Sequence, residues 1–250
     1  MTGLLLRLGG PLQSWGTHST WTERDTHPYP TRSGLIGLIA AAGGHSRTMD
    51  PDRFSPLRFL VRIDRPGTHL VDFHTVGGGR PPKQTVPTAK GGYRQEGTGT
   101  LVSNRHHLSD AVFTVAVTSS DGTMLTETEQ ALRRPYWAGY LGRRACPPDT
   151  PFLITAVDDP HIWLHQRLPL ARPTPYEESV TVEFVAEHPP DEPTGWTDNV
   201  ADDPRDFTPD HRSYRSRPAY RYRRVLPAGL CGGYGTDYLD ALSTALEEAA

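Results

Sequence analysis

The order of strand-like and helix-like segments constrains the fold most. Apolar runs rich in aliphatic and β-branched residues predict strands over residues 3–8, 57–64, 69–76, 110–118, 152–157 and 180–186. Helices are predicted over 34–42, after a Thr31 or Ser33 cap, and over 124–134. This order approximates a βαββαβ unit with one long insert. It predicts an α+β, ferredoxin-like (RRM-like) antiparallel sheet with helices on one face.

Residues 77–107 interrupt that order. They contain seven Gly, five Lys or Arg, one acid and almost no large apolar residue, so they cannot bury a core of their own. A loop of this length inside a compact domain is usually functional. Its positive charge suits a nucleic-acid backbone. We predict a long insertion that reaches out from the sheet.

The last quarter of the 250-residue chain separates its charges. Residues 187–210 hold eight acids and one Arg, whereas 211–224 hold six Arg and no acid. We predict one domain over 1–186, and an extension over 187–250 that packs on it. The extension is expected to hold an acidic, exposed loop, a Tyr/Arg strand and a terminal helix over 237–249. The Tyr/Arg run is interpreted as a charged outer strand; an RNA surface or a partner contact remains open.

Several chemistries lack their motifs. There is no nucleophile elbow, Walker loop or dinucleotide-binding glycine loop. Cys146 and Cys231 form neither a disulfide framework nor a zinc site, so no metal or cofactor is expected. His161 and His165 lack a zincin acid and are interpreted as surface or packing histidines. No apolar run reaches the ~20 residues of a membrane span, and a reducing cytoplasm is the expected compartment.

Other features favour single-stranded nucleic acid. Of 26 basic residues, 24 are Arg, the residue best suited to phosphate and base stacking, although codon bias gives the same excess. Arg32 and Ser33 open a helix whose N–H groups suit phosphate, unless they only cap it. Trp15 stands in a rigid loop and is interpreted either as a ligand-facing or as a core residue. Tyr136, Tyr140, Arg143 and Arg144 lie close together in sequence, as aromatics and arginines do in single-strand binders.

Five ordered motifs resemble the CasD family, a subunit of the type I-E CRISPR surveillance complex, Cascade. They are Leu-Gly-Gly-Pro-Leu-Gln-Ser-Trp-Gly (8–16), Tyr-Pro-Thr-Arg-Ser-Gly-Leu-Ile-Gly-Leu-Ile-Ala-Ala (29–41), Asp-Phe-His-Thr-Val (72–76), Asp-Ala-Val-Phe-Thr-Val-Ala (110–116) and Tyr-Leu-Gly-Arg-Arg-Ala-Cys-Pro (140–147). Their order and spacing match over residues 3–184. Residues 187–250 match poorly, and nothing is carried over there.

The resemblance implies a ferredoxin-like palm with a β-hairpin thumb, here residues 77–107. It implies a non-catalytic subunit that holds the 5′ handle of the CRISPR RNA and caps the complex. The partners implied are a backbone subunit, the large subunit, and target DNA only through the complex. Cleavage in this subtype belongs to another subunit, and no membrane is involved.

Twelve residues are predicted to form the RNA site. Gln13 and Trp15 are expected to shape the handle pocket, and Tyr140 to stack on a base. The remaining residues are expected to hold phosphates, to stand at the base of the thumb, or to fold over the guide: Arg32, Ser33, His74, Lys83, Lys90, Arg94, Arg105, Arg143 and Arg144.

Two other functions remain open. A metal-independent endoribonuclease would use His74, or His106 and His107, with a nearby Tyr as proton donors and acceptors. A plain interaction domain would make the charge of the insert incidental.

Overall fold

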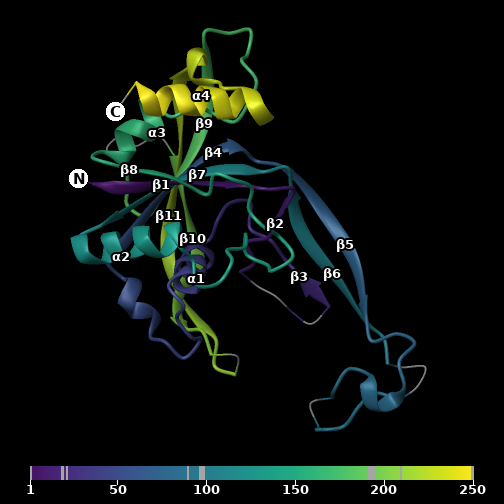
Figure 1. Cartoon of the computed structure of the whole chain (residues 1–250). Coiled ribbons are helices and arrows are strands. Elements are labelled where there is room, and N and C mark those ends of the chain that lie inside the picture. Colours follow the sequence, from purple (N-terminus) through teal and green to yellow (C-terminus); the bar gives the residue numbers. More distant parts are fainter. Residues whose placement is uncertain are drawn as a thin grey trace.

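A seven-stranded sheet forms the centre of the molecule (Figure 1). The structure is a computed structural model, and it describes residues 2–17, 20, 22–88, 90–95, 99–190, 195–208 and 210–248. The strand order is β10-β11-β9-β4-β7-β1-β8. No helix within these residues is long and apolar enough to cross a membrane.

Five of the six predicted strands lie in this sheet and both predicted helices pack on it, whereas the predicted strand 69–76 lies in a separate four-stranded sheet. The elements are β1 (Gly3–Gly9), α1 (Arg32–Ala42), β4 (Leu57–Arg65), β7 (Val112–Ser119), α2 (Gly122–Arg133), β8 (Leu153–Val157) and β9 (Ser179–Ala186). Neighbouring strands all pair antiparallel. Thr31 caps α1 by accepting a hydrogen bond from the Gly34 N–H. The sequence therefore predicted both the element types and their order, and the sheet is mixed α/β and mostly antiparallel.

The helices cover both faces of the sheet, which corrects the expectation of one covered face. α1 and α2 pack against Leu4, Leu6 and Phe113. On the other face, α3 (Pro160–Gln166) and α4 (Gly235–Glu247) pack against Leu5 and Ala116. Figure 1 shows the two pairs of helices on opposite sides. All of β7 is buried, and a continuous apolar run is typical of a strand covered on both faces.

A buried ion pair attaches α3 to the sheet. Arg62 and Asp64 on β4 are both fully buried, and Arg62 Nε lies 2.6 Å from Asp64 Oδ1. Arg62 also donates to the carbonyls of Leu164 and Leu168, at 2.7 and 2.8 Å. Thr114 on β7 donates to Asp64. Hydrogen bonds thus satisfy these charges inside the protein, as burial requires.

The predicted acidic loop is wrong: residues 195–206 form β10 (Gly195–Asp206), which pairs with β11 (Ser213–Pro227). Cross-strand ion pairs join the acidic run to the arginine run. Arg217 Nε lies 2.7 Å from Asp202, and Arg215 Nε lies 2.9 Å from Asp203. Part of the charge separation seen in the sequence is therefore neutralised within one hairpin. β10, and not the Tyr/Arg strand, forms the edge of the sheet.

The predicted insertion also contains a strand. β5 (Thr68–Val76) pairs antiparallel with β6 (Leu101–Ser109), so residues 101–107 are not loop. Two short strands, β2 (Leu12–Gln13) and β3 (Glu23–Arg24), also pair with β6. Figure 1 shows this hairpin projecting away from the sheet, with the described residues of the segment between β5 and β6 at its far end. A continuous run of polar residues, 103–107, hid β6 next to a glycine-rich segment.

Three short 3-10 segments complete the described structure. They are η1 (Pro51–Phe54), η2 (Pro82–Gln84) and η3 (Ala228–Leu230). The first carries Asp52, which pairs with Arg215 of β11. This contact links the connection after α1 to the C-terminal hairpin.

Candidate nucleic-acid interface

A pocket lies between α1 and the irregular segment after α2. Its volume is about 660 Å³, within the range of small-ligand sites. The N–H groups of Tyr136 and Trp137 donate to the carbonyls of Ala42 and Ala41, and so attach this segment to the end of α1. We call this cavity the α1 pocket.

The α1 pocket is aromatic and basic. Tyr140 and Arg144, both predicted, line it together. The other basic and aromatic residues that line it were not predicted as site residues: His45, Arg47, Trp137, Phe207 and Arg212. No acid lines the cavity, and among the described residues no ion pair neutralises its three arginines. Exposed guanidinium groups beside aromatic rings suit the phosphates and bases of a single strand.

Arg143 lies beside the pocket but is used inside the fold. Its guanidinium donates to the carbonyls of Arg24 and Asp25, at 2.7 and 3.1 Å, and to the His106 carbonyl. Burial lowers the pKa of Arg143. Arg143 therefore ties β3 and β6 to the pocket segment, and most of its donors are not available for phosphate.

A glycine makes this junction possible. Gly142 has a φ of 83°, and a Cβ atom there would lie 1.7 Å from the Ser14 carbonyl oxygen. Only glycine fits such a position. The close approach brings the pocket segment against the loop that follows β1.

Gln13 and Trp15 belong to that loop, and their side chains are both buried. Gln13 Nε2 donates to the carbonyls of Leu8 and Ala111, each at 2.8 Å. Trp15 Nε1 donates to Gln13 Oε1 at 3.0 Å. These side chains support the loop from inside, and so the core interpretation of Trp15 fits the structure.

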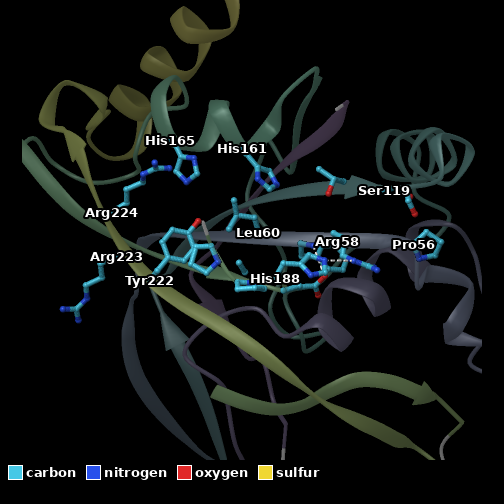
Figure 2. Close-up of a pocket in the computed structure, with 17 residues that line it drawn as sticks. Pro56, Arg58, Leu60, Ser119, His161, His165, His188, Tyr222, Arg223 and Arg224 are labelled. Atoms are coloured by element: carbon cyan, nitrogen blue, oxygen red, sulfur yellow. Dashed lines mark hydrogen bonds between the residues drawn. The ribbon is translucent and has the colours of Figure 1, made fainter. Parts of the chain in front are cut away.

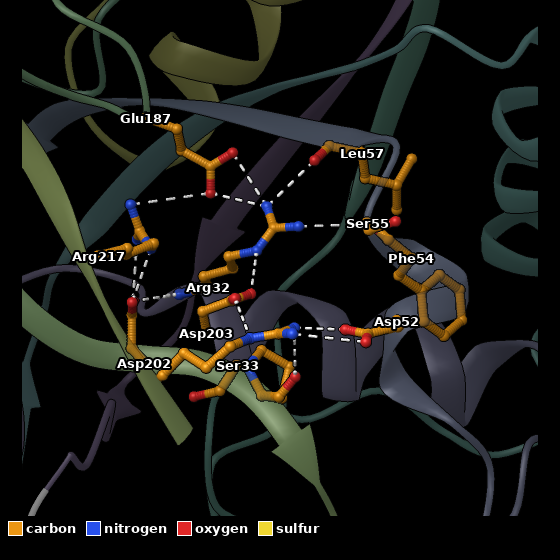
Figure 3. A network of polar contacts seen from close by, with 12 residues as sticks. Arg32, Ser33, Asp52, Phe54, Ser55, Leu57, Glu187, Asp202, Asp203 and Arg217 are labelled. Carbon is orange, nitrogen blue, oxygen red and sulfur yellow. Dashed lines mark hydrogen bonds and ion pairs between the residues drawn. The ribbon is translucent and has the colours of Figure 1, made fainter. Parts of the chain in front are cut away.

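The phosphate role expected of Arg32 is not compatible with its surroundings (Figure 3). Only 6% of its side chain is exposed, and it pairs with Glu187 at 2.8 Å and Asp203 at 3.0 Å. The Arg32 backbone N–H, at the start of α1, donates to Asp202 Oδ2 at 2.7 Å. A carboxylate of the protein itself thus occupies the helix N-terminus where a phosphate was expected. Ser33 stands beside it, with its hydroxyl 3.4 Å from that of Thr31.

The predicted hairpin residues lie apart from the α1 pocket. Lys83 and Lys90 are exposed near the far end of the hairpin, where the Thr85 hydroxyl donates to the Arg94 carbonyl at 2.8 Å. Arg105 on β6 pairs in register with Asp72, and His74 on β5 pairs in register with Ser103. His74 lies 3.5 Å from Asp72. The predicted set is therefore divided between a pocket, a projecting hairpin and a buried support.

The three candidate histidines of a ribonuclease do not form one cluster. His107 is buried, with its Nδ1 3.6 Å from the Cys146 sulfur, and burial lowers its pKa. His106 instead contacts His69 at 2.9 Å and Glu23 at 3.0 Å. His74 pairs in register with Ser103, three positions before His106. Among the described residues no group of three or more potential ligands could hold a metal ion.

Known proteins share both the sequence pattern and the fold. A family profile described as CRISPR-associated protein (Cas_Cas5) matches residues 3–225. The CRISPR system Cascade subunit CasD of Escherichia coli (strain K12) is 35% identical over 206 residues, covering 76% of this chain and 88% of that protein.

Two solved structures extend the likeness. A chain described as "CRISPR RNA-guided surveillance complex" has a TM-score of 0.88 and 44% identity, covering 98% of this chain and 99% of that chain. Another, "Crystal structure of Cas protein", has a TM-score of 0.61 and 30% identity, covering 94% and 99%. The structural likeness therefore includes the C-terminal strands and helix, which the motifs alone did not reach.

Proposed function

Because the chain belongs to the Cas5 family of CRISPR-associated proteins, we propose that it is a non-catalytic, RNA-binding subunit of a Cascade complex. It holds the 5′ handle of the CRISPR RNA, in the cytoplasm, and meets a backbone subunit, the large subunit, and target DNA through the complex. The E. coli relative, a Cascade subunit, supports this role.

The α1 pocket carries the proposal. Three arginines, which have no acidic partner among the described residues, line it together with the aromatic rings of Trp137 and Tyr140. Such a site can hold phosphates through the guanidinium groups while a base lies against a ring. Arg143 and the buried Gln13–Trp15 pair act as positioning residues behind it.

The β5–β6 hairpin is proposed as the thumb. Its exposed apolar side chains, Phe73 at 67% and Val71 at 50%, suit a neighbouring subunit. Lys83, Lys90 and Arg94 near its far end suit the guide backbone. The palm is proposed to have a ferredoxin-like fold. The strand order β4-β7-β1-β8, with α1 and α2 on one face, supports this.

The division of the chain into a palm over 1–186 and an extension over 187–250 belongs to the same proposal. β11 pairs directly with β9 of the palm, and β10 pairs with β11, so the extension lengthens the palm sheet. The Arg32 contacts with Glu187 and Asp203 supply a second attachment.

The test compares two double variants of the full chain with the 5′-handle RNA. Arg144→Ala with Arg212→Ala removes two arginines of the α1 pocket. Losing two phosphate contacts reduces the slope of log affinity against log salt by about 1.4 for a single strand. The matched control is Arg53→Ala with Arg133→Ala, which removes two exposed arginines that pair with Glu127 and Glu129. Equal slopes for the two variants would remove the pocket from the RNA site.

Cleavage is measured in the same samples, in EDTA, with full-length repeat RNA. The proposal expects binding without cleavage, because His74, His106 and His107 do not converge on one place. A specific cut that depends on the 2′-OH and disappears with His106→Ala would identify a ribonuclease instead.

A further inference from the structure

A second pocket opens on the opposite face of the sheet from the α1 pocket. Its volume is about 570 Å³. Side chains alternate along a strand, so residues two apart share a face. On β4, Leu57 and Phe59 pack towards α1, whereas Leu60 packs towards α3. Arg58, two residues before Leu60, therefore faces the α3 side, and we call this cavity the α3 pocket.

Other strands supply the floor and rim by the same alternation. On β11, Tyr222 and Leu226 pack towards α3 and α4, so Arg224 between them faces the same way. On β9, Phe184 belongs to that face. His188, two residues beyond the end of β9, also lines the cavity. Figure 2 shows these side chains around one cavity, with α3 above them.

α3 contributes two histidines to the cavity, His161 and His165. The His165 ring lies 4.8 Å from that of Phe184. Its Nε2 atom is buried and has no hydrogen-bond partner among the described residues. Burial and the nearby Arg224 lower the pKa of His165 to about 4, so the imidazole is neutral at pH 7. A buried ring nitrogen without a partner is costly unless a ligand or water satisfies it.

The rim is cationic and has free donors. Arg58 Nε donates to His188 Nε2 at 3.1 Å and Nη1 donates to the carbonyls of Ser55 and Leu57, whereas Nη2 has no partner among the described residues. Arg224 is exposed, and within the described chain no hydrogen bond or ion pair engages its guanidinium. Hydroxyl groups of Thr118, Ser119 and Ser120 line the same cavity.

Glu187 is the one acid among the described residues that line the cavity, and arginines already neutralise it. Glu187 is 8% exposed and pairs with Arg32 at 2.8 Å and with Arg217 at 3.8 Å. It faces the α1 side of the sheet, where those arginines stand (Figure 3). Among the described residues, the α3 pocket therefore presents arginine and histidine donors and no opposing free carboxylate, which suits a phosphate group.

We propose that the α3 pocket binds the phosphate of a nucleotide unit, at a site separate from the α1 pocket. The cavity is large enough for one nucleotide. Arg58 and Arg224 hold the phosphate from two sides, and the histidines and hydroxyl groups donate further hydrogen bonds. This inference does not depend on the proposed function, because the two pockets lie on opposite faces of the sheet.

The test uses the full chain and three probes: AMP, a 5′-phosphorylated pentathymidylate and the same oligonucleotide with a 5′-hydroxyl. Binding is measured by calorimetry at low salt, and the site is located by hydrogen exchange of residues 117–120, 160–166 and 222–226. Protection by the phosphorylated probes alone indicates a terminal phosphate. Protection by both oligonucleotides indicates an internal phosphodiester.

Substitutions test whether Arg58 and Arg224 are responsible for the binding that protects these segments from hydrogen exchange. Arg58→Ala and Arg224→Ala are each expected to weaken binding at these segments about tenfold. The control Arg133→Ala, on α2 across the sheet, leaves it unchanged. The proposal is overturned if no probe protects these segments, or if the double variant Arg58→Ala with Arg224→Ala binds as the control does. Retained handle-RNA binding in that double variant shows that the α1 pocket is intact.

Discussion

Two long antiparallel hairpins differ in whether their charged side chains are paired within the protein or exposed. In the β10–β11 hairpin, arginines meet acids of the same chain, as Arg217 meets Asp202 and Arg215 meets Asp203. In the β5–β6 hairpin, Lys83 and Lys90 are exposed and Phe73 is 67% exposed. The first hairpin lies in the sheet, and the second projects from it (Figure 1). Charge that is paired internally stabilises the fold, and charge left exposed is available to a partner.

The largest effect is expected from breaking the paired hairpin. Asp202 is 1% exposed and accepts from Arg217 and from the backbone N–H of Arg32. Asp202→Ala leaves these buried donors without a partner, and should lower the free energy of unfolding by about 3–5 kcal/mol. Urea denaturation measures this, with Glu129→Ala as the control at within about 0.5 kcal/mol. A loss below 1 kcal/mol, on the order of a surface pair, would contradict the comparison.

Removing charge from the projecting hairpin should affect binding and not folding. Lys83→Ala, Lys90→Ala and Arg94→Ala together are expected to reduce the salt slope of handle-RNA binding by about 2. The free energy of unfolding should change by less than about 0.5 kcal/mol, since these side chains are at the surface. Filter binding at several salt concentrations and urea denaturation give the two numbers. An unchanged slope would support the plain interaction domain instead.

The apolar part of the projecting hairpin gives a smaller effect. Phe73→Ser should weaken association with neighbouring Cascade subunits by about tenfold, on the order of one partly buried aromatic side chain. The stability of the isolated protein should not fall, because Phe73 is already 67% exposed. Co-purification with the other subunits measures this. Tyr176→Ser, at another exposed aromatic residue, is the control and should not change assembly.

The smallest effect concerns pH at the base of the projecting hairpin. Hydrogen bonds from His106 and Asn104 lower the pKa of Glu23 below its usual value of 4.5. The folded state therefore favours the carboxylate, and its contribution to stability is present above pH 4.5 and is lost as pH falls through the lowered pKa. Amide exchange along β6 should be faster in Glu23→Gln than in the wild type at pH 6. The difference should vanish in strong acid; a difference that persists there would contradict an origin in the hydrogen-bonded Glu23 carboxylate.

The sequence predicted the central strands because their apolar runs are continuous, as in β7. It missed β10, since acids and prolines disfavour a strand, and the signal for its pairing lies in the arginine run that follows it. It also missed α3, and it predicted the terminal helix α4 without placing it on the second face of the sheet. The hydrophobic pattern of the C-terminal residues is not strong enough to predict that α4 packs against the palm.

The site was predicted where its residues are close in sequence. Tyr140 and Arg144 were found because aromatics and arginines stand close together in that segment of the sequence. Arg47, Phe207 and Arg212 were missed, because distant segments without any local pattern bring them to the pocket. Arg32 was assigned to phosphate from its place at a helix start, but its partner Asp202 lies 170 residues further along the chain. Local chemistry cannot reveal such a partner.

The outer strand β10 has one more consequence. An edge strand offers free N–H and C=O groups that can recruit a strand from another chain and start aggregation. β10 carries Pro204, and its register with β11 shifts between Ala201 and Asp203 and again between Pro204 and Asp206. Proline removes a donor and irregular pairing bends the edge, so the strand is a poor template. A protein built to be joined side by side with other subunits thus keeps its longest open edge from growing by strand addition.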